Sequence, residues 1–196
     1  MVSEKYELTR ESSDQVMIPN EAELMARYNG LDKKSTRTLR LLAEEMSCML
    51  PKLLTFGDGS FWIENEGRNY ELHLSVKVNT YERRMLERRR KLSSVQNAAS
   101  SGTVGIKEKI VAAAEWLMYG KDRPPRDKGS AMPGIKSGAN SAVWSLLGYR
   151  DSIKDKPSHK QESDELEKSI IANLADDVTV GITKTTLEIA VKKNFG

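Results

Sequence analysis

Two adjacent acidic residues, Glu44 and Glu45, are the first candidates for chemistry in this chain. A carboxylate can act as a general base, and paired carboxylates separate their pKa values when they are held close together. Neighbouring residues on a helix point about 100° apart, however, so this pair does not converge on one point. Glutamates that lie solvated on a helix surface are therefore the alternative interpretation.

The other reactive side chains are a single cysteine, Cys48, and two histidines, of which His73 lies in a patterned segment. Cys48 falls within a predicted apolar helix, where a free thiol is usually an inert packing group. We expect His73 on the polar face of a strand, opposite Glu66 or Lys77. This composition excludes a disulfide framework and a multi-cysteine zinc site, and the chain lacks the common hydrolase, zinc-protease and Walker motifs.

Two segments have the composition of anion-binding sites. Gly102 and Gly105 precede a predicted helix, whose exposed backbone N–H groups would favour an anion, although an ordinary loop-to-helix junction has the same pattern. The segment Arg83–Lys91 has six basic residues, and together with Glu82 and Glu87 it carries a net of four positive charges, which suits phosphates or an acidic protein surface. Single-stranded nucleic acid is usually bound by several aromatic rings that stack on its bases, and only Tyr81 adjoins this segment, so nucleic-acid binding ranks lowest among the proposed functions. A helix with its charges in solvent is the alternative interpretation of the segment.

The glutamate pair lies in the segment with the clearest helical periodicity. Asp32 can cap this helix, and Phe56–Gly59 ends it. Its apolar face is formed by Leu39, Leu42, Ala43, Met46, Met49, Leu50 and Leu53. Leu41 and Cys48 lie on the opposite side, which predicts that the helix is covered on more than one face.

Shorter elements are predicted upstream of this helix. We expect short strands at Tyr6–Arg10 and Gln15–Ile18, which end at Pro19. A helix is predicted to follow, with Asn20 as its N-cap and Asn29–Gly30 at its end.

Downstream, the period changes to two residues and predicts a hairpin of Phe61–Glu64 and Tyr70–Val78. One face of its second strand is apolar, and the other, with Glu71, His73, Ser75 and Lys77, is expected to be solvated. After this hairpin we expect a helix over Ile106–Tyr119 and a flexible loop over Lys121–Gly138. A short helix over Ser141–Ile153 follows, with Trp144 and Tyr149 exposed. The chain is then predicted to end with a helix from Ser163 to Leu174 and a hairpin of Val178–Ile182 and Thr186–Val191.

Composition and element order limit the class of protein. A chain of 196 residues with a net charge of +3 is one domain by length and has too little excess charge to indicate a nucleic-acid or membrane partner. The first residues lack an apolar run and no stretch is long enough to cross a bilayer, so we expect a cytoplasmic protein. Strands at both ends and in the middle, with helices between them, predict an α+β layered fold, with a loop and helix insertion at about 121–163.

The segment Leu39-Arg40-Leu41-Leu42-Ala43-Glu44-Glu45-Met46 resembles the glutamate-bearing helix of anti-sigma-factor kinases and other histidine-kinase-like ATPases. The order of elements is also similar over most of residues 6–119 and again at the last hairpin. The chain looks closest to small, uncharacterised bacterial proteins described as ATP-binding. This resemblance implies a two-layer α/β sandwich of the histidine-kinase-like ATPase type, with a mixed or antiparallel sheet covered by helices.

The same resemblance implies a set of functional positions, several of which depart from the family pattern. Glu45 would be the general base, and the nucleotide-binding positions would be Glu44, Met49, Asn79, Gly102 and Gly105. The family has a magnesium-binding asparagine where Met49 stands, and neither Met49 nor Cys48 offers magnesium an oxygen. The family aspartate that accepts from adenine is also missing, although Asn79 can accept one hydrogen bond. Only Gly102 and Gly105 resemble the lid glycines.

These departures predict a degenerate member of the superfamily. We expect an ATP-binding-type regulatory protein in which nucleotide binding is weak or lost and which acts through a protein partner. ATP is then the candidate cofactor, no metal-binding residue is assigned, and a homodimer is compatible with the sequence. The alternatives are an interaction module without nucleotide, with Trp144 and Tyr149 as its first candidate surface, and a nucleic-acid binder through Arg83–Lys91. A serine kinase or ATPase is the enzymatic alternative, which the missing ligands argue against.

Overall fold

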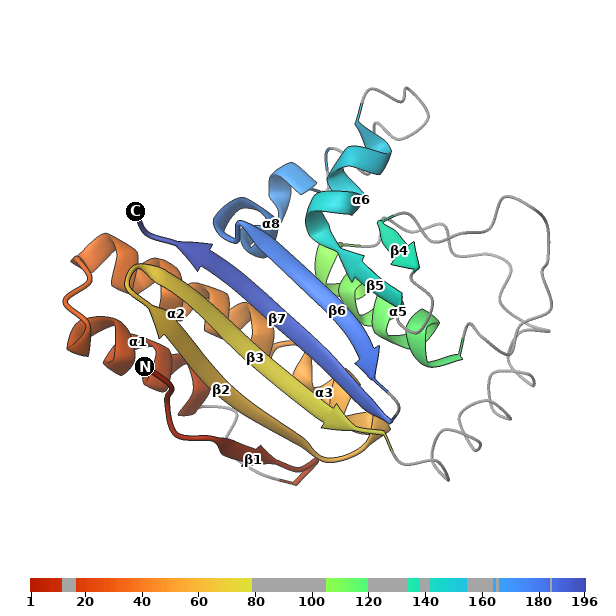
Figure 1. Cartoon of the computed structure of the whole chain (residues 1–196), viewed down its shortest axis with the longest axis horizontal. Helices are drawn as coiled ribbons and strands as arrows, with labels where there is room; N and C mark the ends of the chain where they lie inside the picture. The colour runs from red at the N-terminus through yellow and green to blue at the C-terminus, as the bar shows by residue number, and fades with distance from the viewer. Residues whose placement is uncertain are drawn as a thin grey trace.

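The chain forms one sheet with helices packed against one of its faces (Figure 1). This computed structural model describes residues 1–11, 17–78, 105–119, 134–137, 142–154, 164, 166–183 and 185–196. The strands are β1 (Tyr6–Leu8), β2 (Gly59–Glu66), β3 (Asn69–Lys77), β4 (Ile135–Ser137), β5 (Ala142–Ser145), β6 (Asp177–Thr183) and β7 (Thr186–Asn194). They form a seven-stranded sheet in the order β1-β2-β3-β7-β6-β5-β4, and each neighbouring pair is antiparallel.

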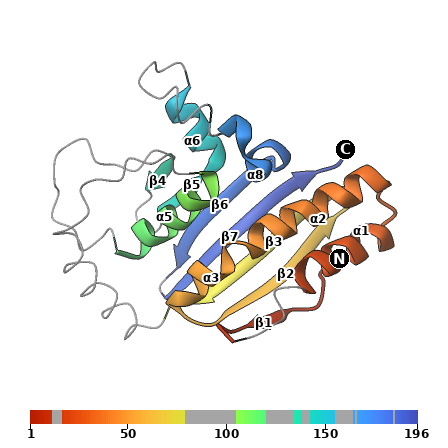
Figure 2. The ribbon, with the colours of Figure 1, turned by 180° about the vertical axis from the view of Figure 1, so that it is seen from behind.

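The helices that cover the sheet come from the whole length of the chain. They are α1 (Met17–Tyr28), α2 (Lys33–Ser47), α3 (Leu50–Leu53), α5 (Ile106–Tyr119), α6 (Leu146–Ile153) and α8 (Ile170–Leu174), with a 3-10 turn, η2, at Leu54–Phe56. Figure 2 shows α1, α2, α3 and α5 lying across the same face of the sheet. The predicted α+β class, with an antiparallel sheet covered by helices, is therefore confirmed.

The hairpin of β2 and β3 has the alternation that its sequence predicts. Tyr70, Leu72, Leu74 and Val76 are all buried on the helix-covered side of β3. Glu66 pairs directly with Asn69, which leaves a two-residue turn, and Gly67 in that turn has a φ of 60°. Glycine takes this left-handed conformation without the steric cost that a Cβ would add.

The predicted caps around the second helix are also confirmed. The Asp32 carboxylate accepts hydrogen bonds from the backbone N–H groups of Lys34, at 2.8 Å, and Ser35, at 3.1 Å. These bonds satisfy amides that have no partner within the helix. The preceding helix, α1, ends at Tyr28 as expected, and Gly30 follows it with a φ of 70°.

The start of α1 was predicted wrongly. Met17 and Ile18 are helical instead of extended, and Asn20 lies inside the helix instead of capping it. Pro19 is tolerated because an amide in the first helical turn has no intrahelical acceptor to lose. Burial of Ile18, Ala22, Met25 and Ala26 gives this helix its inward face.

The long helix predicted through Leu53 is interrupted after Ser47. Cys48 is the C-cap of α2, and a separate short helix, α3, follows. Pro51 has no N–H to donate to Ser47, and its ring disfavours a continuous helix through this region. Cys48 is exposed, so the prediction that its thiol packs among apolar side chains is wrong.

The segment around Trp144 differs most from its prediction. Ala142–Ser145 forms β5, the helix begins only at Leu146, and Ile135–Ser137, predicted as loop, forms β4. Because β5 pairs with β6, Trp144 is directed into the core and is fully buried, and Tyr149 is 3% exposed. The expectation that these two rings form an exposed surface for a partner is therefore wrong.

Further on, Ser169 interrupts the helix that was predicted from Ser163 to Leu174. Ser169 caps α8, and its hydroxyl accepts a hydrogen bond from the N–H of Ala172.

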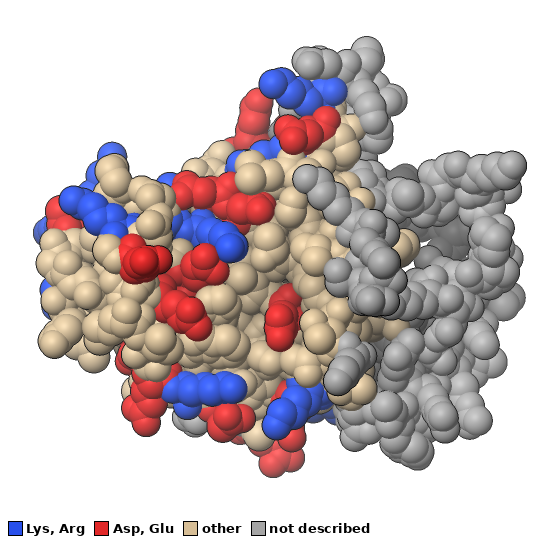
Figure 3. Space-filling view, viewed as in Figure 1, with Lys and Arg blue, Asp and Glu red and all other residues tan. Residues whose placement is uncertain are grey.

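The uncovered face of the sheet carries a mixture of acidic and basic side chains (Figure 3). His73 lies on this face beside Trp62 and Ala190, and not opposite Glu66 or Lys77 as expected. The His73 and Trp62 rings stack, with centroids 4.9 Å apart and planes inclined by 8°. Half-burial of His73 lowers its pKa below the usual value, although Glu64 and Glu71 act in the opposite direction.

The lowered pKa of His73 predicts a loss of stability at mildly acidic pH. As the pH falls below about 6.5, the unfolded chain takes up a proton on this histidine before the folded chain does, so folding becomes less favourable. We expect the free energy of unfolding, measured with urea at pH 7 and pH 5, to fall less in His73→Gln than in the wild type. Equal decreases in the two proteins would contradict this role, since His159 and the carboxyl groups are common to both.

Candidate functional site

The helix that carries Glu44 and Glu45 ends close to the start of α5. Two ion pairs connect these elements: Lys107 Nζ lies 3.4 Å from Glu45 Oε2, and Lys52 Nζ lies 3.8 Å from Glu108 Oε1. We call this region the α2–α5 junction, and define it by Glu45, Met49, Lys52, Gly105, Lys107 and Glu108. Residues more than 50 positions apart in the sequence meet here, at the place where the resemblance would put a nucleotide.

The two adjacent glutamates point to different neighbours. Glu45 faces α5, and its side chain is only 13% exposed. Glu44 instead accepts a hydrogen bond from Nε of Arg40, at 3.0 Å, and Arg40 also pairs with Glu23 of α1. The prediction that neighbouring glutamates on a helix do not converge is therefore confirmed, and a shared proton between them is excluded by this geometry.

Met49, which stands where the family has its magnesium-binding asparagine, is part of the apolar core. Met49 is 1% exposed and lies among buried aliphatic side chains. Its thioether sulfur is a soft donor, whereas magnesium requires oxygen ligands. In the part of the chain that the structure describes, no three His, Cys, Asp or Glu side chains gather where a metal ion could be held.

The start of α5 already has a negative group beside it. The carbonyl of Gly105 accepts the first helical hydrogen bond, from the N–H of Lys109 at 3.1 Å. A Cβ added to Gly105 would lie 2.8 Å from Oε2 of Glu108, so this carboxylate folds back over the first turn. A helix N-terminus favours a negative charge. The Glu108 carboxylate thus takes the position in which a phosphate would gain the same stabilisation.

The charges at the α2–α5 junction balance within the chain. Glu45 and Glu108 face Lys107 and Lys52, so the described residues of the junction have no excess positive charge for a triphosphate. With a buried methionine where the family has its magnesium-binding asparagine, the described residues do not fit a magnesium nucleotide. Two of the predicted nucleotide-binding positions, Asn79 and Gly102, lie outside the described residues. The basic segment Arg83–Lys91, the candidate for the lowest-ranked alternative of nucleic-acid binding, lies outside them as well.

Sequence reasoning missed three members of this junction. Glu108 stands three residues after Gly105, which is the spacing at which a helix N-terminus is often closed by a carboxylate, so its role had a local signal. No local sequence signal could have indicated Lys52 and Lys107, because each pairs with a residue more than 50 positions away.

Comparisons with known proteins do not add to this geometry. No family model matches the chain, and no curated protein matches it. Among the helices that the structure describes, none combines the length and apolar character needed to cross a membrane.

Proposed function

We propose that this chain is an ATP-binding-type regulatory protein with a histidine-kinase-like ATPase fold, in which nucleotide binding is weak or lost. In this proposal it acts through contact with a protein partner instead of through catalysis. The main support is the α2–α5 junction, where the glutamate-bearing helix meets a helix that follows a glycine. The antiparallel sheet beneath these helices has the layered arrangement that the resemblance implies.

Internal ion pairs support the weakened nucleotide binding. Glu45 is engaged by Lys107, so a general base at this position would first have to leave its partner. Glu108 lies over the first turn of α5 and would repel a phosphate there. A phosphoryl-transfer enzyme relies on positioned cations to offset the charge of the phosphates, and the junction has no cation in excess.

An interaction module that binds no nucleotide is the second candidate function. It is favoured by the burial of Met49 and by the closure of the junction through two ion pairs. The two candidates differ in one measurable property, which is whether the α2–α5 junction retains nucleotide binding that stabilises the folded protein and responds to Glu108→Gln.

The proposal is tested by thermal unfolding with ATP and ADP, each with and without magnesium. For the wild type we expect a midpoint change of about 1 °C or less, because a ligand present near its Kd adds only about 0.4 kcal/mol. Glu108→Gln removes the carboxylate that competes with phosphate. An affinity gain of about tenfold would raise the midpoint change to about 3–5 °C at the same nucleotide concentration.

The matched control is Glu66→Gln, which removes the same charge at the exposed last residue of β2. It should leave the response to ATP as in the wild type. If neither the wild type nor Glu108→Gln responds at millimolar ATP, nucleotide binding is excluded and the interaction module is favoured. A large magnesium-dependent change in the wild type would instead contradict the weakened site and support the enzymatic alternative, with Glu45→Gln as the next variant.

A further inference from the structure

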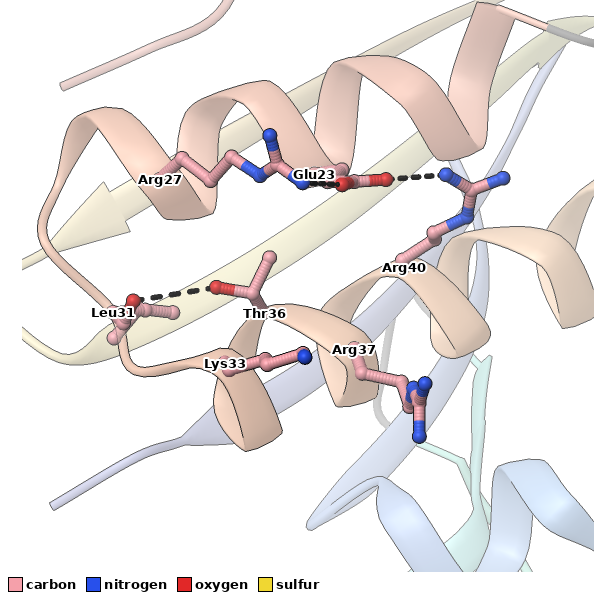
Figure 4. A pocket seen from close by; sticks show the side chains of 7 residues that line it. All are labelled: Glu23, Arg27, Leu31, Lys33, Thr36, Arg37 and Arg40. Atoms are coloured by element: carbon pink, nitrogen blue, oxygen red, sulfur yellow. Dashed lines mark hydrogen bonds and ion pairs between the residues drawn. The ribbon is translucent and has the colours of Figure 1, made fainter.

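A groove of about 590 Å³ lies between α1 and α2. Four of the side chains that line it are cationic and one is acidic: Arg27, Lys33, Arg37 and Arg40, with Glu23. Figure 4 shows Glu23 and Arg27 projecting from α1, and the other three cationic residues projecting from α2. The groove therefore has a clear excess of positive charge.

Two of the cations are already neutralised within the protein. The Glu23 carboxylate receives hydrogen bonds from Arg27 and from Arg40, one from each helix (Figure 4). The hydrogen bond from Arg40 holds the pKa of Glu23 below its usual value, so this carboxylate stays ionised at neutral pH. Arg40 also binds Glu44, which completes its pairing.

The other two cations, Lys33 and Arg37, are left with their charge uncompensated. Both side chains are exposed, and neither forms an ion pair with another residue that the structure describes. They are four positions apart on α2, so they lie on the same side of the helix. Between them Thr36 is fixed, because its hydroxyl donates to the carbonyl of Leu31 at 3.3 Å.

We propose that this groove binds the phosphoryl group of a small phosphate ester or polyphosphate. A phosphoryl group carries about two negative charges at neutral pH, which matches the two uncompensated cations, whereas a carboxylate carries one. The planar guanidinium of Arg37 suits two-point recognition of phosphate oxygens, and Lys33 supplies a mobile point charge. The volume of the groove lies in the range of small-molecule sites.

This site is separate from the α2–α5 junction and does not depend on the proposed function. ATP also carries phosphoryl groups, so it could occupy the groove even if the junction binds no nucleotide. Variants of Lys33 and Arg37 report on the groove alone, and Glu108→Gln reports on the junction alone. The two proposals can therefore fail independently.

The test is an NMR titration of the labelled full chain with inorganic pyrophosphate at constant ionic strength. We expect saturable shifts of backbone amides in α1 and α2 around Glu23, Lys33 and Arg37. The double variant Lys33→Gln/Arg37→Gln should weaken the affinity by about tenfold or more, because it removes both uncompensated cations. The matched control, Lys34→Gln/Lys77→Gln, loses the same charge at two residues that do not line the groove, and should bind as the wild type does.

Further arms of the titration identify the ligand class. Glycerol phosphate should shift the same amides as pyrophosphate, and Glu108→Gln should leave both affinities unchanged. The proposal is overturned if sodium chloride reproduces the shifts, if no saturation occurs, or if the control variant loses as much affinity as the groove variant. Tighter binding of an oligoglutamate peptide than of either phosphate would also overturn it, and would assign the groove to an acidic protein segment.

Discussion

Replacing Trp144 with alanine is expected to lower the free energy of unfolding by about 3–5 kcal/mol. The Trp144 side chain is fully buried in β5, between Ile135 of β4 and Val180 of β6. Its ring centroid lies 6.1 Å from that of Tyr149. Truncation removes a large apolar surface from the core and leaves a cavity that the neighbouring strands can fill only in part. Urea unfolding followed by far-UV circular dichroism measures the loss.

Trp62→Ala is the matched control for this variant. Trp62 is half-buried on the uncovered face of the sheet and stacks on His73, so its truncation should cost only about 0.5–1.5 kcal/mol. Equal losses for the two variants would contradict the burial of Trp144. The comparison also bears on function, because failure of a Trp144 variant to bind a partner would reflect loss of folding and not loss of a contact surface.

Long elements with a strong period were predictable because many residues contribute to one signal. The alternation from Tyr70 to Val78 and the helical spacing from Ile106 to Tyr119 gave the elements found in the structure. The Asp32 cap was predictable for a related reason, since a side chain that accepts from N–H groups two and three positions ahead acts locally.

Short elements and distant pairs were not predictable in the same way. Strand β5 has four residues, and its single alternation of exposed Val143 and buried Trp144 is too short to separate a strand from a helix. Pro19 is compatible both with the end of a strand and with the first turn of a helix, so local preference could not decide between them.

The candidate site was predictable only in the parts that helix geometry determines. The divergence of Glu44 and Glu45 follows from the angle between neighbouring residues on a helix. The ion pair of Glu45 with Lys107 depends instead on how α5 packs beside α2, and no local pattern encodes that. The groove between α1 and α2 was missed for the same reason, because its cations are unremarkable until the two helices are placed together.

Replacing Gly134 with alanine is expected to destabilise the protein by about 2–5 kcal/mol, because a left-handed conformation and a steric conflict add together. Gly134 has a φ of 88° and accepts a hydrogen bond from the N–H of Ser145 at 3.1 Å. A Cβ at this position would lie 2.8 Å from Nε1 of Trp144, 2.9 Å from the backbone nitrogen of Tyr149 and 3.0 Å from the carbonyl oxygen of Ser145. Two of these atoms are backbone, so they cannot move aside without disturbing the junction of β5 and α6.

Gly67→Ala separates the two contributions to this loss. Gly67 also has a positive φ, of 60°, but a Cβ there would meet no atom within 4 Å. Its substitution should therefore cost only the conformational part, about 1–2 kcal/mol. The difference between the two variants in urea unfolding then measures how tightly Gly134 is packed against β5 and α6. If Gly134→Ala is no more destabilising than Gly67→Ala, the close approach of Gly134 to β5 and α6 is wrong. The packing of the β4–β5 edge around Trp144 would then be wrong as well.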